Sequence, residues 1–494
     1  MSITVVFVHG WSVTNLDTYG ELPIRLKAEA QQQGIDIEVN EIFLGRYISF
    51  HDEVGLEDIS RAFDTAVKEQ LNESSRFICI THSTGGPIIR EWWNNFYKNV
   101  TPPLSHLIML APANFGSALA ILGKGTLSRI KTWFEGIEPG KGVLDWLECG
   151  SADSWQLNKE WISSDGNQIS PAGVFPFVIT GQSIDRKLYD HLNSYTGELG
   201  SDGVIRASSA NLNSRYIKLI QEADENGPNQ IIISPELKVV EYKESPVVPY
   251  RIIKGKSHSG NSMGIMKSVK KEITDSNSKD TVNAILDCIK VTDKNQYNLL
   301  IKQFDNETHQ VQTDELIEHV DKLFATPRHF IHDRFSQIIF RVTDSQGYPV
   351  KDYDLIFTAG EKNDANHLPS GFAIDRQQNK NNPETITYYF NYDVMKGAPQ
   401  NEFRDKLPEA NLLGLKVNPR PTEGFVRFVP CHIVANADLL DKALKPNSTT
   451  LIDIVIQRVV SKEVFKLEKL VGNTMPSSIE GNFKRIKPGN EIVR

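Results

Sequence analysis

The chain has 494 residues, of which 39% are hydrophobic and 23% are charged, and its formal net charge is −8. This length suffices for two or three domains, and the ordinary composition excludes a disordered chain. The acidic balance argues against nucleic acid as the main partner, because no basic surface dominates. The cysteines show no paired spacing, which favours free thiols and a reducing compartment. They are Cys79, Cys149, Cys288 and Cys431.

The N-terminal segment is typical of a buried strand rather than a leader peptide. An apolar, β-branched run covers residues 3–8 and leads directly into His9-Gly10-Trp11. No apolar run in the chain approaches the roughly 20 residues that a transmembrane helix needs. We therefore expect a chain without a transmembrane segment that is cytoplasmic in the producing cell. Action on a target cell or its membrane would require non-classical export.

Residues 77–87 form the most specific motif of the chain. A β-branched strand pattern stops at Ser83, and Gly85 and Gly86 then allow a tight turn into a helix. This order predicts a nucleophile elbow, in which a serine hydroxyl is exposed at a sharp strand-to-helix turn. Thr81 stands where the usual pattern has glycine, and a threonine is tolerated there if its side chain points away from the incoming helix.

The blocks around this elbow resemble the lipase and esterase branch of the α/β-hydrolase superfamily. After the elbow come an apolar helical face over residues 88–96, a buried strand over 105–112 and the run Ala113-Asn114-Phe115-Gly116-Ser117. Within this branch, the chain is most similar to the lecithin–cholesterol acyltransferase-like, PGAP-like and bacterial lipases. A lipase without a leader but with an added domain also resembles secreted bacterial lipase effectors.

The resemblance implies the fold and the order of the catalytic residues. We expect residues 1–290 to form an α/β-hydrolase catalytic domain with a mostly parallel sheet and an inserted helical cap. In this superfamily the nucleophile comes first in the chain, then an acid, then a histidine.

The acid is predicted from a loop that is similar to those of such lipases. Gly200-Ser201-Asp202-Gly203-Val204 has the expected pattern, and Ser208-Ser209-Ala210 completes the match. We therefore predict Asp202 as the acid, with Asp185, which follows an apolar strand, as the alternative.

The base is predicted as His258, which lies in a loop of small residues between an expected strand and a helix start. His191 precedes Asp202 and would break the chain order.

These residues together predict acyl transfer from an ester to water. Ser83 attacks the carbonyl, His258 takes the proton, and Asp202 orients the imidazole. The backbone N–H groups of Trp11 and Thr84 are the predicted oxyanion hole. We expect neither a cofactor nor a metal to be required, because the chain has no Cys/His ligand spacing and no dense acidic loop.

Residues 117–171 interrupt the alternation of strands and helices and are predicted to form a cap or lid. Four of the chain's seven tryptophans lie in this insertion, which suits an apolar acyl groove or a lipid interface. We expect Trp133 and Phe134 to face the substrate. The alternative is a small helical subdomain whose tryptophans fill its own core.

The remaining chain is predicted to be a connector and an accessory domain. Two polar helices, residues 296–304 and 315–324, are expected within a connector over 291–330. Strand and turn patterns over 331–494 predict an all-β, sandwich-like accessory domain without a catalytic constellation. We expect this domain to dock a protein partner or a membrane, with passive stabilisation as the alternative.

The primary hypothesis is therefore a serine hydrolase that cleaves lipid carboxylic esters, as a lipase or phospholipase A acting at a membrane or micelle surface. A soluble carboxylesterase or thioesterase is the alternative enzyme. A non-catalytic binding or scaffold protein with a hydrolase fold is the alternative of another class. The presence of Ser83, Asp202 and His258 in the expected order argues against a scaffold.

Overall fold

The structure is a computed structural model. It describes residues 2–9, 18–49, 52–71, 76–98, 100–123, 140–186, 197–225, 231–322, 325–410, 412–434, 439 and 442–460.

The first unit is built around a six-stranded parallel sheet with the strand order β2-β1-β3-β4-β5-β8. Its strands are β1 (Ile3–His9), β2 (Ile37–Phe43), β3 (Phe77–His82), β4 (Leu104–Leu110), β5 (Phe175–Thr180) and β8 (Tyr250–Ile252). The central strands are nearly continuous runs of buried residues, because helices cover both faces of the sheet. This arrangement confirms the predicted α/β-hydrolase class.

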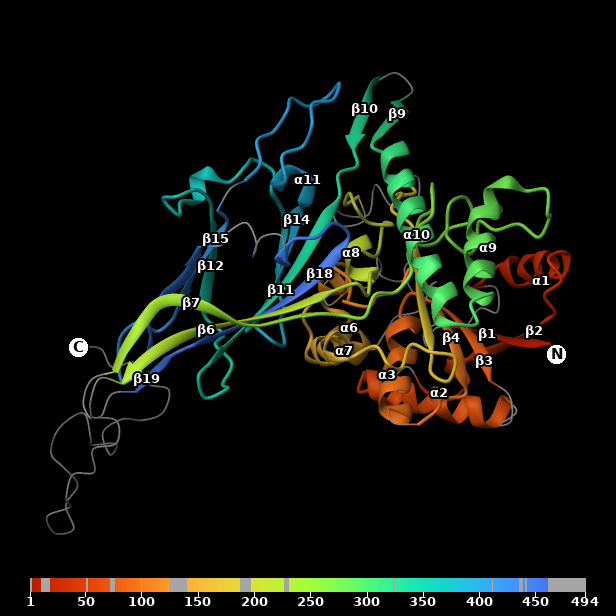
Figure 1. Cartoon of the computed structure of the whole chain (residues 1–494), viewed down its shortest axis with the longest axis horizontal. Helices are drawn as coiled ribbons and strands as arrows, with labels where there is room; N and C mark the ends of the chain where they lie inside the picture. The colour runs from red at the N-terminus through yellow and green to blue at the C-terminus, as the bar shows by residue number, and fades with distance from the viewer. Residues whose placement is uncertain are drawn as a thin grey trace, which may run out of the picture.

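The helices of this unit lie on the two sides of the sheet (Figure 1). Helices α1 and α9 pack together on one side, and α2 and α3 pack together on the other, while α10 runs beside β8. Their bounds are α1 (Leu22–Gln32), α2 (Leu56–Gln70), α3 (Gly85–Tyr97), α9 (Ser276–Ile289) and α10 (Lys294–Asp314). No helix in the described ranges is both long enough and apolar enough to cross a membrane.

The second unit is a nine-stranded mixed sheet with the order β12-β15-β17-β7-β6-β18-β11-β14-β13. Its strands are β6 (Arg215–Glu225), β7 (Ile231–Glu244), β11 (Phe335–Asp344), β12 (Tyr353–Thr358), β13 (Ala373–Gln378), β14 (Thr385–Asn391), β15 (Gly414–Pro419), β17 (Cys431–Val434) and β18 (Ser448–Ile456). The predicted all-β C-terminal unit is confirmed, and its form is one mixed sheet that curls around an apolar core (Figure 1).

Short elements complete the described chain. Two small antiparallel pairs are β9 (Ile317–Lys322) with β10 (Ala325–Ile331) and β16 (Val426–Phe428) with β19 (Arg458–Val460). The remaining helices are η1 (Leu44–Arg46), α4 (Ala120–Gly123), α6 (Lys141–Leu147), α7 (Ala152–Ser163), α8 (Ala207–Ala210), η2 (Ala365–His367) and α11 (Tyr392–Met395).

The domain boundary predicted at residue 290 is wrong for one segment. The hairpin of β6 and β7 precedes that boundary, but β6 pairs in parallel with β18 and thus belongs to the second sheet. The pairing partner of β6 lies more than two hundred residues further along the chain, so no local pattern reveals it.

The predicted connector helices are also corrected. A single helix, α10, replaces the expected helix 296–304, and the side chain of Asp293 caps its start by accepting from the N–H groups of Asn295 and Gln296. The expected helix 315–324 is instead the start of the β9–β10 hairpin. Ile317–Lys322 pairs antiparallel with β10, a partner strand that lies beyond the expected helix, so the pattern of residues 315–324 alone does not reveal it.

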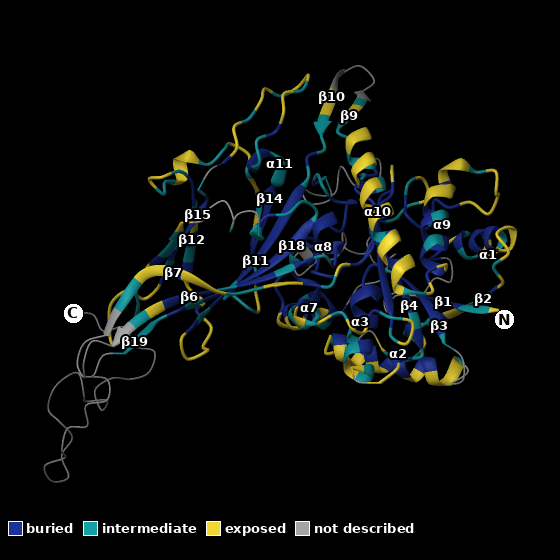
Figure 2. Ribbon diagram, viewed as in Figure 1, coloured by how far each residue is buried: buried dark blue, intermediate teal, exposed yellow. Residues whose placement is uncertain are grey.

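The two faces of the second sheet pack against different surroundings. Ile338 and Phe340 of β11 belong to the apolar core inside the curl, whereas Ile339 between them packs with Trp155 and Phe115 of the first unit. This follows from the alternation of side chains along a strand. The central strands of both sheets are largely buried, and the exposed residues lie on the outer helices, on loops and on the β6–β7 hairpin (Figure 2).

Candidate active site

Ser83 lies at the turn between β3 and α3, at the carboxyl end of the parallel sheet. Its φ of 54° is in the left-handed region, which is uncommon for a residue with a side chain. Its N–H donates to the carbonyl of Leu110 at 3.0 Å, and its carbonyl accepts from the N–H of Ala113 at 3.1 Å. The neighbouring strand end thus holds the strained turn, as expected for a nucleophile elbow.

The glycines after Ser83 are required by close packing. A Cβ on Gly86 would lie 2.7 Å from Cβ of Pro112, and a Cβ on Gly85 would lie 3.0 Å from Cβ of Thr81. The condition that the Thr81 side chain points away from the helix is therefore not met. Its side chain faces Gly85, and the threonine is tolerated because Gly85 leaves that space empty.

His258 joins Ser83 to Asp202 through its two ring nitrogens. Nε2 lies 3.1 Å from Oγ of Ser83, and Nδ1 lies 2.9 Å from Oδ2 of Asp202. All three residues are buried, with Asp202 at 0% exposure. Nδ1–H donates to the carboxylate in the tautomer that this network favours, which leaves Nε2 free to accept the serine proton.

Asp202 accepts hydrogen bonds from the backbone of its own loop. Its Oδ1 accepts from the N–H groups of Val204 at 3.0 Å and Ile205 at 2.7 Å. The N–H of His258 also donates to the Asp202 carbonyl at 2.9 Å, so backbone and side-chain contacts join the two loops. Burial and the nearby charge of Asp202 raise the pKa of Tyr250, which keeps that phenol neutral.

The alternative acid, Asp185, contacts a different group. Its Oδ2 accepts from the hydroxyl of Ser262 at 2.6 Å, within the loop that follows His258. The geometry therefore brings Asp202, rather than Asp185, to the imidazole of His258.

His82 is a site residue that the sequence reasoning missed. Its ring lies 4.6 Å from the ring of His258, and its Nε2 is 3.1 Å from the His258 carbonyl. Burial, and then the charge of His258, lower the pKa of His82 well below its ordinary value, so the ring is neutral and donates to that carbonyl. Its position directly before Ser83 was the only available signal.

The predicted oxyanion hole and lid are only partly within the described ranges. Thr84 directly precedes α3, whose first N–H groups have no partner inside the helix. Trp11, Trp133 and Phe134 lie outside the described residues.

The described part of the insertion packs between the first unit and the second sheet. Trp146 and Trp155 are buried, and Trp155 belongs to the apolar cluster that includes Leu451 of the second sheet. Nε1–H of Trp161 donates to the carbonyl of Leu212 at 3.1 Å. These three tryptophans pack against the two main units rather than in a separate core of the insertion, and the lid itself stays a prediction.

No protein-family model and no curated protein matches this chain. Two solved structures of phospholipase PlaB from Legionella pneumophila match over nearly the whole length. The structure in complex with thio-NAD is 40% identical, with 97% of this chain and 98% of that chain covered and a TM-score of 0.82. The other is 43% identical, with 96% and 97% covered and a TM-score of 0.82. The chain therefore belongs to the PlaB phospholipase family, within the lipase and esterase branch of the α/β hydrolases.

Proposed function

We propose that this protein hydrolyses carboxylic esters of phospholipids with Ser83 as nucleophile, His258 as general base and Asp202 as the residue that orients it. The observation that carries the proposal is the buried chain of contacts from Ser83 Oγ through His258 to Asp202, at 3.1 and 2.9 Å. These distances are within the range that nucleophile activation requires. The substrate class is inferred from the family, since the similar Legionella protein is a phospholipase.

The first half of the reaction forms an acyl-enzyme. Ser83 Oγ bonds to the ester carbonyl carbon while its proton passes to Nε2 of His258, and the carbonyl electrons move to the oxygen. The tetrahedral intermediate then collapses, the bond to the alcohol oxygen breaks, and His258 returns the proton to the leaving lysophospholipid.

The second half releases the fatty acid. Water bonds to the acyl carbon as His258 takes one of its protons, and the proton then returns to Ser83 Oγ as the acyl–serine bond breaks. Asp202 stays ionised and stabilises the imidazolium in both halves.

The developing oxyanion requires fixed donors. The N–H of Thr84 follows the nucleophile at the start of α3, where the helix dipole also favours negative charge. We assign the second donor to the N–H of Trp11. Loss of one such donor typically reduces kcat on the order of 10² to 10³.

The test is product analysis by mass spectrometry with mixed phospholipid and triacylglycerol liposomes and with short p-nitrophenyl esters. Wild type is compared with Ser83→Ala and with Ser60→Ala, which removes a buried hydroxyl that contacts Glu57 in α2. Lysophospholipid and fatty acid are expected from wild type and Ser60→Ala only, together with serine-dependent labelling by a fluorophosphonate.

Other outcomes would select the alternatives. Cleavage of the short esters alone would indicate a soluble esterase, and release from triacylglycerol alone would indicate a lipase. No serine-dependent product from any substrate would contradict the proposal and favour a binding protein. Docking of a protein partner or membrane by the second sheet stays a prediction.

A further inference from the structure

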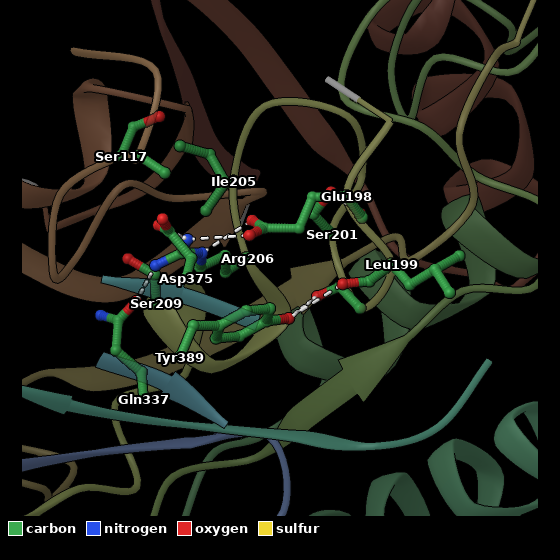
Figure 3. A network of polar contacts seen from close by, with 12 residues as sticks. Ser117, Glu198, Leu199, Ser201, Ile205, Arg206, Ser209, Gln337, Asp375 and Tyr389 are labelled. Atoms are coloured by element: carbon green, nitrogen blue, oxygen red, sulfur yellow. Dashed lines mark hydrogen bonds and ion pairs between the residues drawn. The ribbon is translucent and has the colours of Figure 1, made fainter. Parts of the chain in front are cut away.

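The loop that carries Asp202 lies between the two sheets and contains a buried cation. Arg206 follows Asp202 by four residues and is only 2% exposed. Figure 3 shows its guanidinium between the carboxyl groups of Glu198 and Asp375 and beside the ring of Tyr389. A buried guanidinium is costly unless charges and acceptors surround it, so its partners matter for the loop.

The first partner of Arg206 closes the loop on itself. Nε and Nη2 of Arg206 donate to the two carboxylate oxygens of Glu198 at 2.8 and 2.9 Å, which is a bidentate pair. Ser201 hydroxyl donates to the Glu198 carbonyl at 2.6 Å, and Ser201 forms a backbone bridge with Arg206. Glu198 and Arg206 thus join the two ends of the loop, and Asp202 lies between them.

Three further side chains around the Arg206 guanidinium come from the second sheet. Nη2 donates to Oδ2 of Asp375 in β13, and Nη1 donates to Oε1 of Gln337 in β11 at 3.3 Å. The guanidinium carbon lies 4.2 Å from the ring centre of Tyr389 in β14. Burial opposes the charge of Arg206, but the charges of Glu198 and Asp375 hold its pKa above the ordinary value, so it remains a cation.

A separate contact places the backbone of the loop on the same sheet. The hydroxyl of Tyr389 lies 3.1 Å from the carbonyl oxygens of both Leu199 and Gly200. A Cβ on Gly200 would overlap the ring of Phe335 and the hydroxyl of Tyr389, and the φ of Gly200 is 72°. The loop backbone therefore rests directly on these rings, which a larger residue at 200 would prevent.

We propose that the second sheet is a positioning element of the active site, with Arg206 as the positioning residue that ties the Asp202 loop to Asp375, Gln337 and Tyr389. This rests on the proposed catalytic role of Asp202. The accessory unit then sets where the carboxylate meets His258, in addition to any docking role. A displacement of about 1 Å in such a group can reduce the rate on the order of 10².

The test compares two carboxylates on the same face of the second sheet. Asp375→Asn removes the charge that faces Arg206 and nearly preserves shape. The matched control is Asp453→Asn, whose carboxylate accepts from Arg341 at 2.7 Å and from Tyr216 at 2.7 Å, away from the loop. Tyr389→Phe is the second test variant, because it removes only the hydroxyl.

Two measurements are made on the full-length variants. The first is kcat and KM on phospholipid vesicles, with active sites counted by fluorophosphonate titration so that unfolded protein is excluded. Asp375→Asn is expected to lower kcat on the order of 10- to 100-fold with little change in KM. Asp375→Glu is expected to recover most of it, and Asp453→Asn to stay near wild type.

The second measurement does not depend on activity. The N–H groups of Val204 and Ile205 bind Asp202, and their amide hydrogen exchange is expected to accelerate in Asp375→Asn and Tyr389→Phe but not in Asp453→Asn. Unchanged exchange and unchanged kcat in both test variants, or equal losses in the control, would overturn the positioning role. If exchange accelerates in the two test variants but the wild-type protein shows no serine-dependent hydrolysis, the proposed function is refuted and the positioning role of the second sheet is not.

Discussion

Ser83 and Asp202 are held in place in different ways. Ser83 is held mainly by one short segment, in which β3, the strained turn and α3 follow one another. Its N–H also donates to the carbonyl of Leu110 at the end of the neighbouring strand. Asp202 lies in a loop whose cation, Arg206, is bound by residues from three strands of another sheet.

The difference indicates that the two ends of the site respond to different changes. The serine end depends on close packing of small residues, so a single added methyl group is expected to lower the stability of the fold there. The acid end depends on buried ion pairs, so removal of one charged residue leaves the opposite charge buried without its partner. Substitutions can therefore separate the two ends.

The largest expected effect is that of Asp202→Asn. The asparagine can keep the shape of the loop but favours the wrong tautomer of His258, so we expect kcat to fall on the order of 10⁴. Steady-state kinetics on phospholipid vesicles measures this loss. Asp185→Asn is the matched control and should retain activity, because Asp185 contacts Ser262 rather than His258. Equal losses in both variants would show that the acid is misassigned.

A smaller effect is expected from Gly85→Ala at the serine end. The new Cβ would lie 3.0 Å from Cβ of Thr81, so we expect the free energy of unfolding to fall by about 1–3 kcal/mol. Urea unfolding and the rate of fluorophosphonate labelling measure the change. The double variant Thr81→Gly, Gly85→Ala should recover part of the loss, because the contact is then removed. Strict additivity of the two substitutions would argue against this contact.

The smallest expected effect concerns pH and spares both ends of the site. Burial lowers the pKa of His106 in β4 from 6.5 to about 4. As the pH falls, His106 therefore binds its proton in the unfolded chain before it does so in the folded chain. The stability that neutral His106 contributes to the fold is fully present above pH 6.5 and is lost toward pH 4.

As the pH falls between those values, protonation of His106 in the unfolded chain should lower the free energy of unfolding by about 1.4 kcal/mol per pH unit. His106→Gln, in which the amide can still donate to the Val291 carbonyl, should remove this part of the slope in urea titrations at several pH values. The kcat profile should keep its wild-type shape. An unchanged stability slope would show that His106 titrates near its ordinary pKa.

The elements around Ser83 were predictable because their signals are local. The β-branched run before Ser83 and the glycines after it lie within a few residues, and the parallel sheet follows from similar buried runs. Asp202 and His258 were predicted from resemblance and chain order, and the structure places His258 against Ser83 and Asp202 against His258. The direction of the Thr81 side chain was not predictable, since it depends on how closely α3 approaches β3.

The primary sequence specified the elbow at Ser83 and the class of the first domain, because steric limits and strand or helix periodicity act over neighbouring positions. Asp202 and His258 followed only from the resemblance to lipases and its chain order. The tertiary structure alone decided that β6 and β7 join the second sheet and that Arg206 meets Gln337, 131 residues further along the chain. Strand pairing and buried ion pairs depend on partners distant in sequence. Their energies exist only once the chain has brought those partners together and excluded water.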